Sequence, residues 1–126
     1  MIYRETLPEG CPPDVSVDIA LETYVFRLVK TSPATLDDFR SQRAEKPAAV
    51  FKGVTECHAC GLSVFKERQD AVQKVLLLPR FRGFHVYSVR LAAGAGRIQQ
   101  TFQPSHHTWW PLAEFDILGH CERETA

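Results

Sequence analysis

The segment from Phe84 to Leu91 restricts the possible folds more than any other part of the chain. It is rich in aromatic and β-branched side chains, Pro79 precedes it, and Gly94-Ala95-Gly96 follows it. A segment of this composition between turn residues is typical of a β-strand. Alternation predicts one face made of His85, Tyr87, Val89 and Leu91 and an opposite face made of Phe84, Val86, Ser88 and Arg90. Because glycine tolerates positive φ, we expect a tight reversal at residues 94–96 and a hairpin with residues 97–102.

Similar patterns along the chain predict the remaining elements. We expect strands over residues 24–29, 62–65 and 115–118, one helix that begins at Thr35-Leu36-Asp37-Asp38 and stops before Pro47, and a second helix over residues 67–78. Residues 47–61 fit neither the helical nor the strand period, so we expect a long loop there. This order of elements predicts an α+β fold with a mostly antiparallel sheet of about five strands and two helices in a single domain.

The length of 126 residues and the hydrophobic content of 44% suit one domain that buries its own core. We divide the chain into an irregular, proline-containing N-terminal arm of residues 1–21, a single α+β domain of residues 22–121 and an acidic tail of residues 122–126. The longest apolar run, Val75 to Leu78, is far shorter than the ~20 residues that cross a bilayer, and the N-terminus has no apolar signal core. We therefore expect a cytoplasmic protein with no membrane partner and with reduced cysteines.

Residues 71–113 contain no Asp or Glu, although the whole chain balances 15 basic against 15 acidic side chains. The basic residues of this segment are Lys74, Arg80, Arg82, Arg90 and Arg97. Such an imbalance concentrates positive potential, and guanidinium groups are well matched to phosphate. We therefore predict an anionic ligand, bound by these arginines at one end of the sheet. The alternative is a solvated basic edge that prevents pairing between sheets.

Both tryptophans and two of the five histidines lie in the sequence Ser105-His106-His107-Thr108-Trp109-Trp110-Pro111. Indole rings can stack on bases, and imidazole titrates near neutral pH and can transfer protons. Neighbouring residues of an extended chain point in opposite directions, so we expect one indole in the core and the other, Trp109 or Trp110, in contact with a ligand. We interpret this segment as a ligand-binding loop, and the alternative is that its histidines are merely exposed.

A catalytic interpretation uses His106 or His107 as the acid-base group and Glu114 as an orienting or catalytic carboxylate. Arg27, which lies among valines on one strand face, would then bind the anionic group of the substrate. The order of elements is similar, in fold only, to that of compact ADP-ribosyltransferases, and this resemblance implies an arginine or histidine on an early strand and a late glutamate. The chain lacks the paired-acid signature of that family. An internal ion pair from Arg27 to Glu114 or Asp116 is the structural alternative.

The sequence Cys57-His58-Ala59-Cys60-Gly61 has the spacing of a zinc knuckle, in which two thiolates bind one metal ion. Such a site needs a second pair of ligands. The pairs His120-Cys121 and His106-His107 consist of adjacent residues, which chelate less well than residues with a two-residue spacer. We therefore favour packed cysteines over a structural zinc at Cys57 and Cys60.

Three functions are compatible with these patterns. The first is a binding module for a nucleotide-like anion or single-stranded nucleic acid, the second is a small enzyme acting on a nucleotide-like substrate, and the third is a protein-interaction module with a tryptophan hot spot. The chain lacks the phosphate loop, the dinucleotide-binding glycine turn, His-Glu-x-x-His and Gly-x-Ser-x-Gly. The commonest nucleotide-binding and hydrolase classes are therefore excluded.

Overall fold

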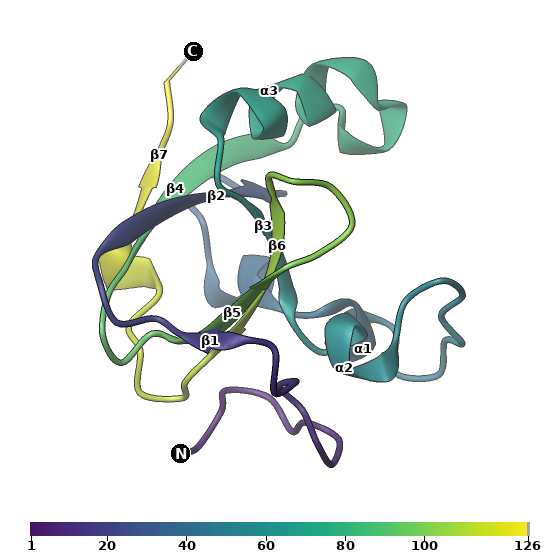
Figure 1. Ribbon diagram of the computed structural model, residues 1–126. Coiled ribbons are helices and arrows are strands. Elements are labelled where there is room, and N and C mark those ends of the chain that lie inside the picture. The colour runs from purple at the N-terminus through teal and green to yellow at the C-terminus, as the bar shows by residue number, and fades with distance from the viewer. Residues whose placement is uncertain (126) are drawn as a thin grey trace.

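Seven strands form one antiparallel sheet in the computed structural model, which describes residues 1–125 (Figure 1). The strands are β1 (Val17–Asp18), β2 (Thr23–Val29), β3 (Leu62–Phe65), β4 (His85–Leu91), β5 (Gly96–Gln100), β6 (His106–Pro111) and β7 (Cys121–Arg123). Their order across the sheet is β1-β5-β6-β3-β2-β4-β7. Each pair of neighbouring strands is antiparallel.

Three α-helices and three 3-10 helices connect the strands. The α-helices are α1 (Gln42–Glu45), α2 (Glu56–Ala59) and α3 (Arg68–Leu77), and the 3-10 helices are η1 (Leu36–Phe39), η2 (Pro79–Phe81) and η3 (Leu118–His120). The prediction of about five strands and two helices is therefore wrong in both numbers. β1, β7, α1 and α2 contain two to four residues each, too few to produce a periodic hydrophobic pattern. No helix within residues 1–125 is long and apolar enough to cross a membrane.

The helix expected over residues 35–47 is divided into η1 and α1. Arg40 is extended at the division, with φ −107° and ψ 143°, and the Ser41 hydroxyl accepts a hydrogen bond from the Ala44 N–H as the N-cap of α1. The carboxylate of Glu5 accepts hydrogen bonds from the backbone N–H and the hydroxyl of Ser41, at 2.9 and 2.5 Å. The break is thus fixed by a residue far away in the sequence.

β4 and β5 do not form the expected hairpin, because β6, β3 and β2 lie between them. Gly94 and Gly96 do have positive φ, and the Ala95 N–H donates to the Ala92 carbonyl at 3.0 Å. In a flat sheet β4 and β5 would be about 19 Å apart, whereas the chain from Leu91 to Gly96 reaches about 17 Å when fully extended. The sheet must therefore curve strongly. Figure 1 shows this curvature, with β2 and β4 above β1 and β5 in the view.

The hydrophobic core fills the inside of the curved sheet, and strands β2 to β6 all contribute to it. Its buried members are Ile19, Val25, Val29, Phe39, Leu62, Val64, Tyr87, Val89, Leu91, Ala95, Ile98, Trp109 and Ile117. Along β4, the alternation predicted from the sequence places Tyr87, Val89 and Leu91 in this core. The core is thus built by inward-facing residues of successive strands, as in other curved antiparallel sheets.

The two ends of the chain join the sheet. β1 pairs with β5, Tyr3 forms a β-bridge with Leu112, and β7 pairs with β4 on the opposite edge. The expected irregular arm and acidic tail therefore each supply residues to an edge strand. The strand expected at residues 115–118 is wrong, since the last strand begins at Cys121.

Candidate functional site

Two of the arginines predicted to bind an anion are occupied by protein groups. Arg97 lies on β5, where its Nε donates to the Ser16 hydroxyl at 2.7 Å and its Nη1 forms an ion pair with Asp18 at 3.1 Å. Arg90 lies on β4 and forms an ion pair with Glu22 at 3.6 Å. β4 and β5 are not neighbours in the sheet, and each of these two guanidinium groups already pairs with a carboxylate from residues 18–22. The geometry therefore removes the basis for an anion site on a β4–β5 hairpin.

Arg27 fills a split in the sheet. β2 and β3 pair at a single position, Phe26 with Phe65, and then diverge. The Arg27 guanidinium bridges the gap by donating to three carbonyl oxygens, those of Asp38 at 3.0 Å, Ser63 at 2.8 Å and Arg40 at 3.3 Å. Burial lowers the pKa of Arg27 to about 10, so it stays charged at neutral pH. Its partners are carbonyls and not the expected Glu114 or Asp116, and its role here is structural.

Both tryptophans are buried, on opposite faces of β6. Trp109 lies in the core, where its Nε1 donates to the Ala95 carbonyl at 3.0 Å. Trp110 is covered by α2, and its Nε1 donates to the Cys57 carbonyl at 3.0 Å. A Cβ atom on Gly61 would clash with the Thr108 Cγ2 and lie 3.0 Å from that nitrogen, so glycine makes room for both β6 side chains. The expectation of opposite faces is confirmed, but neither indole is free to stack on a ligand.

The three residues of the catalytic interpretation lie at opposite ends of β6. His106 and His107 begin the strand, and the exposed Glu114 follows its other end. Five residue steps along a strand span about 16 Å, so Glu114 does not reach the imidazoles. Desolvation lowers the pKa of His106 and of His107, which keeps both rings uncharged at neutral pH. The prediction of a loop at His106 and His107 is also wrong, because residues 106–111 form a strand that pairs with both β5 and β3.

Cys57 forms a disulfide with Cys11, and it therefore does not offer a thiolate beside Cys60 for zinc. The expectation of reduced cysteines is wrong for this pair, because residues 46 positions apart in the sequence meet in the fold. Burial raises the pKa of the Cys60 thiol to about 11, and its Sγ donates to Glu56 at 3.6 Å. Such a thiol is a poor metal ligand and nucleophile at neutral pH. Within residues 1–125 there is no cluster of three or more His, Cys, Asp and Glu side chains that could hold a metal ion.

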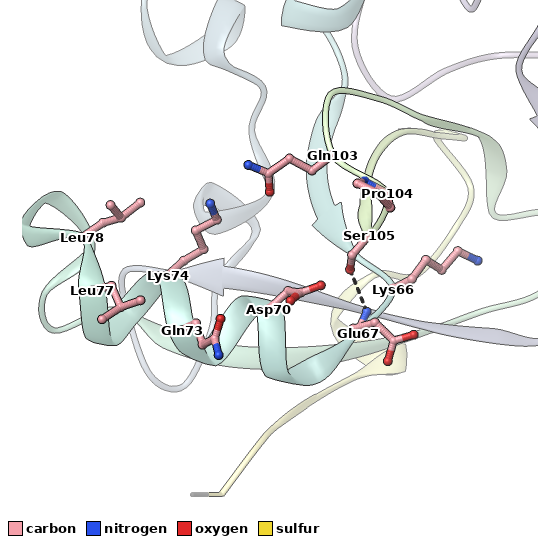
Figure 2. Close-up of a pocket in the computed structure, with 10 residues that line it drawn as sticks. All are labelled: Lys66, Glu67, Asp70, Gln73, Lys74, Leu77, Leu78, Gln103, Pro104 and Ser105. Carbon is pink, nitrogen blue, oxygen red and sulfur yellow. Dashed lines mark hydrogen bonds between the residues drawn. The ribbon is translucent and has the colours of Figure 1, made fainter.

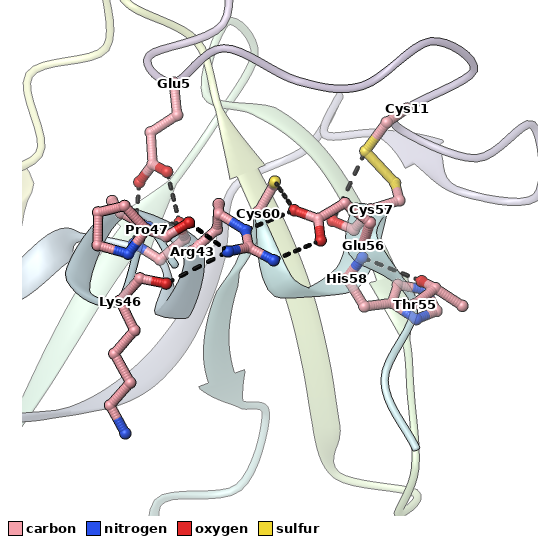
Figure 3. A network of polar contacts seen from close by, with 12 residues as sticks. Glu5, Cys11, Arg43, Lys46, Pro47, Thr55, Glu56, Cys57, His58 and Cys60 are labelled. Atoms are coloured by element: carbon pink, nitrogen blue, oxygen red, sulfur yellow. Dashed lines mark hydrogen bonds and ion pairs between the residues drawn. A yellow bond between two sulfur atoms is a disulfide. The ribbon is translucent and has the colours of Figure 1, made fainter. Parts of the chain in front are cut away.

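The surroundings of the disulfide contain a dense polar network (Figure 3). Arg43 forms a two-pronged ion pair with Glu56, with both N–O distances at 2.7 Å. The same guanidinium donates to the carbonyl oxygens of Pro47 and Lys46, and it lies 4.7 Å from the centre of the Phe51 ring. Each nitrogen of the Arg43 guanidinium thus has an acceptor within the protein. This region holds α1 and α2 together.

Arg80 and Arg82 differ from every other arginine of residues 1–125, because their side chains make neither a hydrogen bond nor an ion pair. The arginines that do make such contacts are Arg4, Arg27, Arg40, Arg43, Arg68, Arg90, Arg97 and Arg123. Arg80 and Arg82 are both exposed and lie in the connection from α3 to β4. We call residues 76–84 the α3 tip. In Figure 1 the tip lies at the top of the molecule, and the N-terminus lies at the bottom.

Two exposed leucines stand beside these arginines. Leu76 and Leu77 end α3 and are 74% and 72% exposed. Three consecutive leucines, from Leu76 to Leu78, span about 200° around a helix, so one sheet face cannot cover them all. The helix buries Ala71 toward the sheet and leaves these two side chains in solvent. Three consecutive leucines therefore indicate in the sequence that part of α3 exposes apolar side chains. The i, i+3, i+4 pattern of apolar residues in this helix does not indicate that exposure.

The α3 tip is an ordered turn. Pro79 begins η2, and the Phe84 N–H donates to the Phe81 carbonyl at 3.0 Å. The Phe81 and Phe84 rings pack edge to face with centres 5.2 Å apart, and the Arg80 guanidinium lies 4.9 Å from the Phe81 ring centre. Gly83 has φ of 85°, a conformation that suits glycine in a tight turn. The two arginines are therefore presented by a defined structure.

A groove of about 580 Å³ runs beside the tip, between α3 and the loop that joins β5 to β6 (Figure 2). Asp70, Gln73, Lys74 and Leu77 follow the i, i+3, i+4, i+7 pattern of one helix face and form one wall. Residues 103–105 form the other wall, where the Ser105 hydroxyl accepts a hydrogen bond from the Glu67 N–H at 3.1 Å. The groove carries both acidic and basic groups, so its charge favours neither an anion nor a cation.

Phe102 sets the conformation of the groove's loop wall. It is the one non-glycine residue with positive φ within residues 1–125, at 62°, and its side chain is 63% exposed. Its ring packs beside His106, with centres 5.3 Å apart, and beside His58 at 6.3 Å. The Thr101 hydroxyl bonds to the His106 ring at 2.9 Å. His106, which sequence patterns indicated as catalytic, thus supports this turn.

Comparison of the chain with protein-family models, with curated proteins and with solved structures finds no match. The choice among functions therefore depends on the chemistry of the α3 tip and the groove.

Proposed function

We propose that the protein is a binding module for an anionic partner, which docks on Arg80 and Arg82 at the α3 tip. The single observation that carries this proposal is that these two guanidinium groups are exposed and unpaired, whereas the other arginines of residues 1–125 all have protein partners. Guanidinium groups bind phosphate and carboxylate groups through paired donors. An anion can therefore dock without first breaking an internal contact.

The surroundings of the tip favour the same partner. No Asp or Glu occurs between residues 71 and 113, so no acid within this segment offsets the two arginines. Lys74, on the preceding turn of α3, forms no ion pair within the described chain and adds a third positive charge. Clustered like charges raise the local concentration of an oppositely charged partner.

A titration with a labelled single-stranded oligonucleotide as a model polyanion tests this proposal. Binding should weaken with added salt, and Arg80→Gln/Arg82→Gln should make the slope of log K against log salt shallower by about 1.4, since each lost phosphate contact removes about 0.7. The matched control is Lys46→Gln/Lys52→Gln, which removes two exposed charges elsewhere on the molecule. Equal slopes for the two double variants would overturn the proposal.

A further inference from the structure

We infer that the anionic partner of the α3 tip is the surface of a bilayer that contains anionic lipids. This inference rests on the anion-binding function proposed above and narrows it to one class of partner. It replaces the expectation of no membrane partner, which was based only on the lack of an apolar segment long enough to cross a bilayer. It also accounts for the exposed Leu76 and Leu77, which precede the two arginines in the sequence and which the binding of a simple anion does not require.

The apolar part of the tip suits lipid better than nucleic acid. Single-stranded nucleic acids bind through aromatic rings on which bases stack. The tip offers no free ring, because Phe81 and Phe84 are half-buried and pack against each other. Its most exposed large apolar side chains are instead the aliphatic Leu76 and Leu77. Aliphatic side chains enter the boundary between headgroups and acyl chains of a bilayer.

The basic part of the tip suits the headgroups of the same surface. Arg80 and Arg82 follow the leucines within one ordered turn, so the two kinds of side chain are presented by one segment. Phosphate and carboxylate groups of anionic lipids accept hydrogen bonds from guanidinium, and each basic side chain near such a surface strengthens binding about fivefold. Cations beside aliphatic side chains are the pattern of proteins that bind the bilayer interface.

The acids of α3 indicate how the molecule would lie on the surface. Glu67 and Asp70 are at the N-terminal end of the helix, and Asp70 precedes Leu77 by about 10 Å of helix rise. An anionic surface repels these carboxylates and attracts the tip, so α3 would point its C-terminal end at the membrane. The N-terminal arm, at the opposite end of the molecule in Figure 1, would then face away from the bilayer.

The test is co-sedimentation of the full chain with vesicles of phosphatidylcholine alone and with vesicles of equimolar phosphatidylcholine and phosphatidylserine. We expect binding to the anionic vesicles only. Leu76→Ser/Leu77→Ser should lower the partition coefficient by at least about tenfold, because two buried leucines are lost from the interface. Arg80→Gln/Arg82→Gln should lower it by about 25-fold, from two losses of about fivefold each.

The matched apolar control is Leu21→Ser/Val50→Ser, which replaces two side chains that are 83% and 87% exposed and lie outside the tip. This variant should bind vesicles as the unchanged protein does, and circular dichroism should give the same spectrum for all variants. Binding to the oligonucleotide but not to anionic vesicles would overturn the lipid inference and leave the anion-binding function standing. Failure to bind either would overturn both. An unchanged partition coefficient for Leu76→Ser/Leu77→Ser would also overturn the inference.

Discussion

The region around the Cys11–Cys57 disulfide and the α3 tip use charged and apolar side chains in opposite ways. Beside the disulfide, Arg43 is held by Glu56 and by two carbonyls, and Trp110 is fully buried under α2. At the tip, Arg80 and Arg82 form no hydrogen bond or ion pair within residues 1–125, and Leu76 and Leu77 lie in solvent. A paired, buried group stabilises the fold, whereas an unpaired, exposed group is available to a partner. The difference separates a region whose polar groups are paired within the protein from a region that we propose binds a partner.

The largest effect on stability should come from Trp110→Ala. The indole is buried against Gly61 and α2, so its removal leaves a cavity and an unpaired Cys57 carbonyl. We expect a loss of about 3–5 kcal/mol in the free energy of unfolding, measured by urea denaturation. The comparison variant is Leu76→Ala at the tip, for which the change should stay within about 0.5 kcal/mol. Similar losses at the two positions would remove the proposed distinction between the regions.

Loss of the disulfide should have the next largest effect. Cys11→Ser removes a covalent link between residues 46 positions apart. The unfolded chain then gains conformational entropy, which predicts a destabilisation of about 4 kcal/mol. Cys121→Ser, which replaces a half-exposed free thiol, is the control. A reducing agent should lower the denaturation midpoint of the unchanged protein and leave that of Cys11→Ser where it is. If the reducing agent shifts neither midpoint, the disulfide does not stabilise the folded chain.

Asp38, in η1, tests whether a paired and buried charge stabilises the fold, because its carboxylate accepts hydrogen bonds from the turn after β2. Burial opposes its charge, but hydrogen bonds from the Thr31 hydroxyl and from the backbone N–H groups of Thr35, Lys30 and Thr31 together lower the pKa of Asp38. A carboxyl whose folded pKa lies below its unfolded value, about 3.9, stabilises the fold above that pH and loses this contribution as pH falls through the folded pKa.

Asp38→Asn should therefore lower the free energy of unfolding by about 2 kcal/mol at neutral pH, since hydrogen bonds to a charged group are lost. It should also flatten the decrease in stability of the unchanged protein below pH of about 4. Denaturation midpoints measured from neutral to acidic pH check both points. An identical pH profile for the two proteins would contradict the structural role of this carboxylate.

The sequence predicted local elements better than it predicted how they meet. β2, β3, β4 and α3 lie where their patterns place them, because alternation or a helical stripe over several residues is a local property. The short strands β1 and β7 carry no such pattern, and their pairing depends on the curvature of the whole sheet. The polar and aromatic composition of residues 105–111 resembled a loop, although β5 and β3 on either side make residues 106–111 a strand.

The candidate site shows the same limit. Arg80, Arg82, Arg90 and Arg97 are equivalent in a charge pattern, but in the fold Arg97 meets Asp18, which lies 79 positions away. Which arginines are free therefore depends on long-range contacts that local sequence does not encode. The exposed leucines could have been anticipated, since three in succession exceed what one helix face can bury.

The smallest expected effect concerns the stability of the tip itself. Arg80→Gln/Arg82→Gln should change the free energy of unfolding by no more than about 0.5 kcal/mol, because neither side chain has a hydrogen bond or ion pair to lose. Arg97→Gln should cost about 1 kcal/mol, since it removes hydrogen bonds to Ser16 and the contact with Asp18. Urea denaturation measures both changes, and the salt-dependent binding titration should rank the variants in the reverse order. If the tip variant is destabilised as much as Arg97→Gln, its arginines have structural partners in solution and are not free to bind an anion.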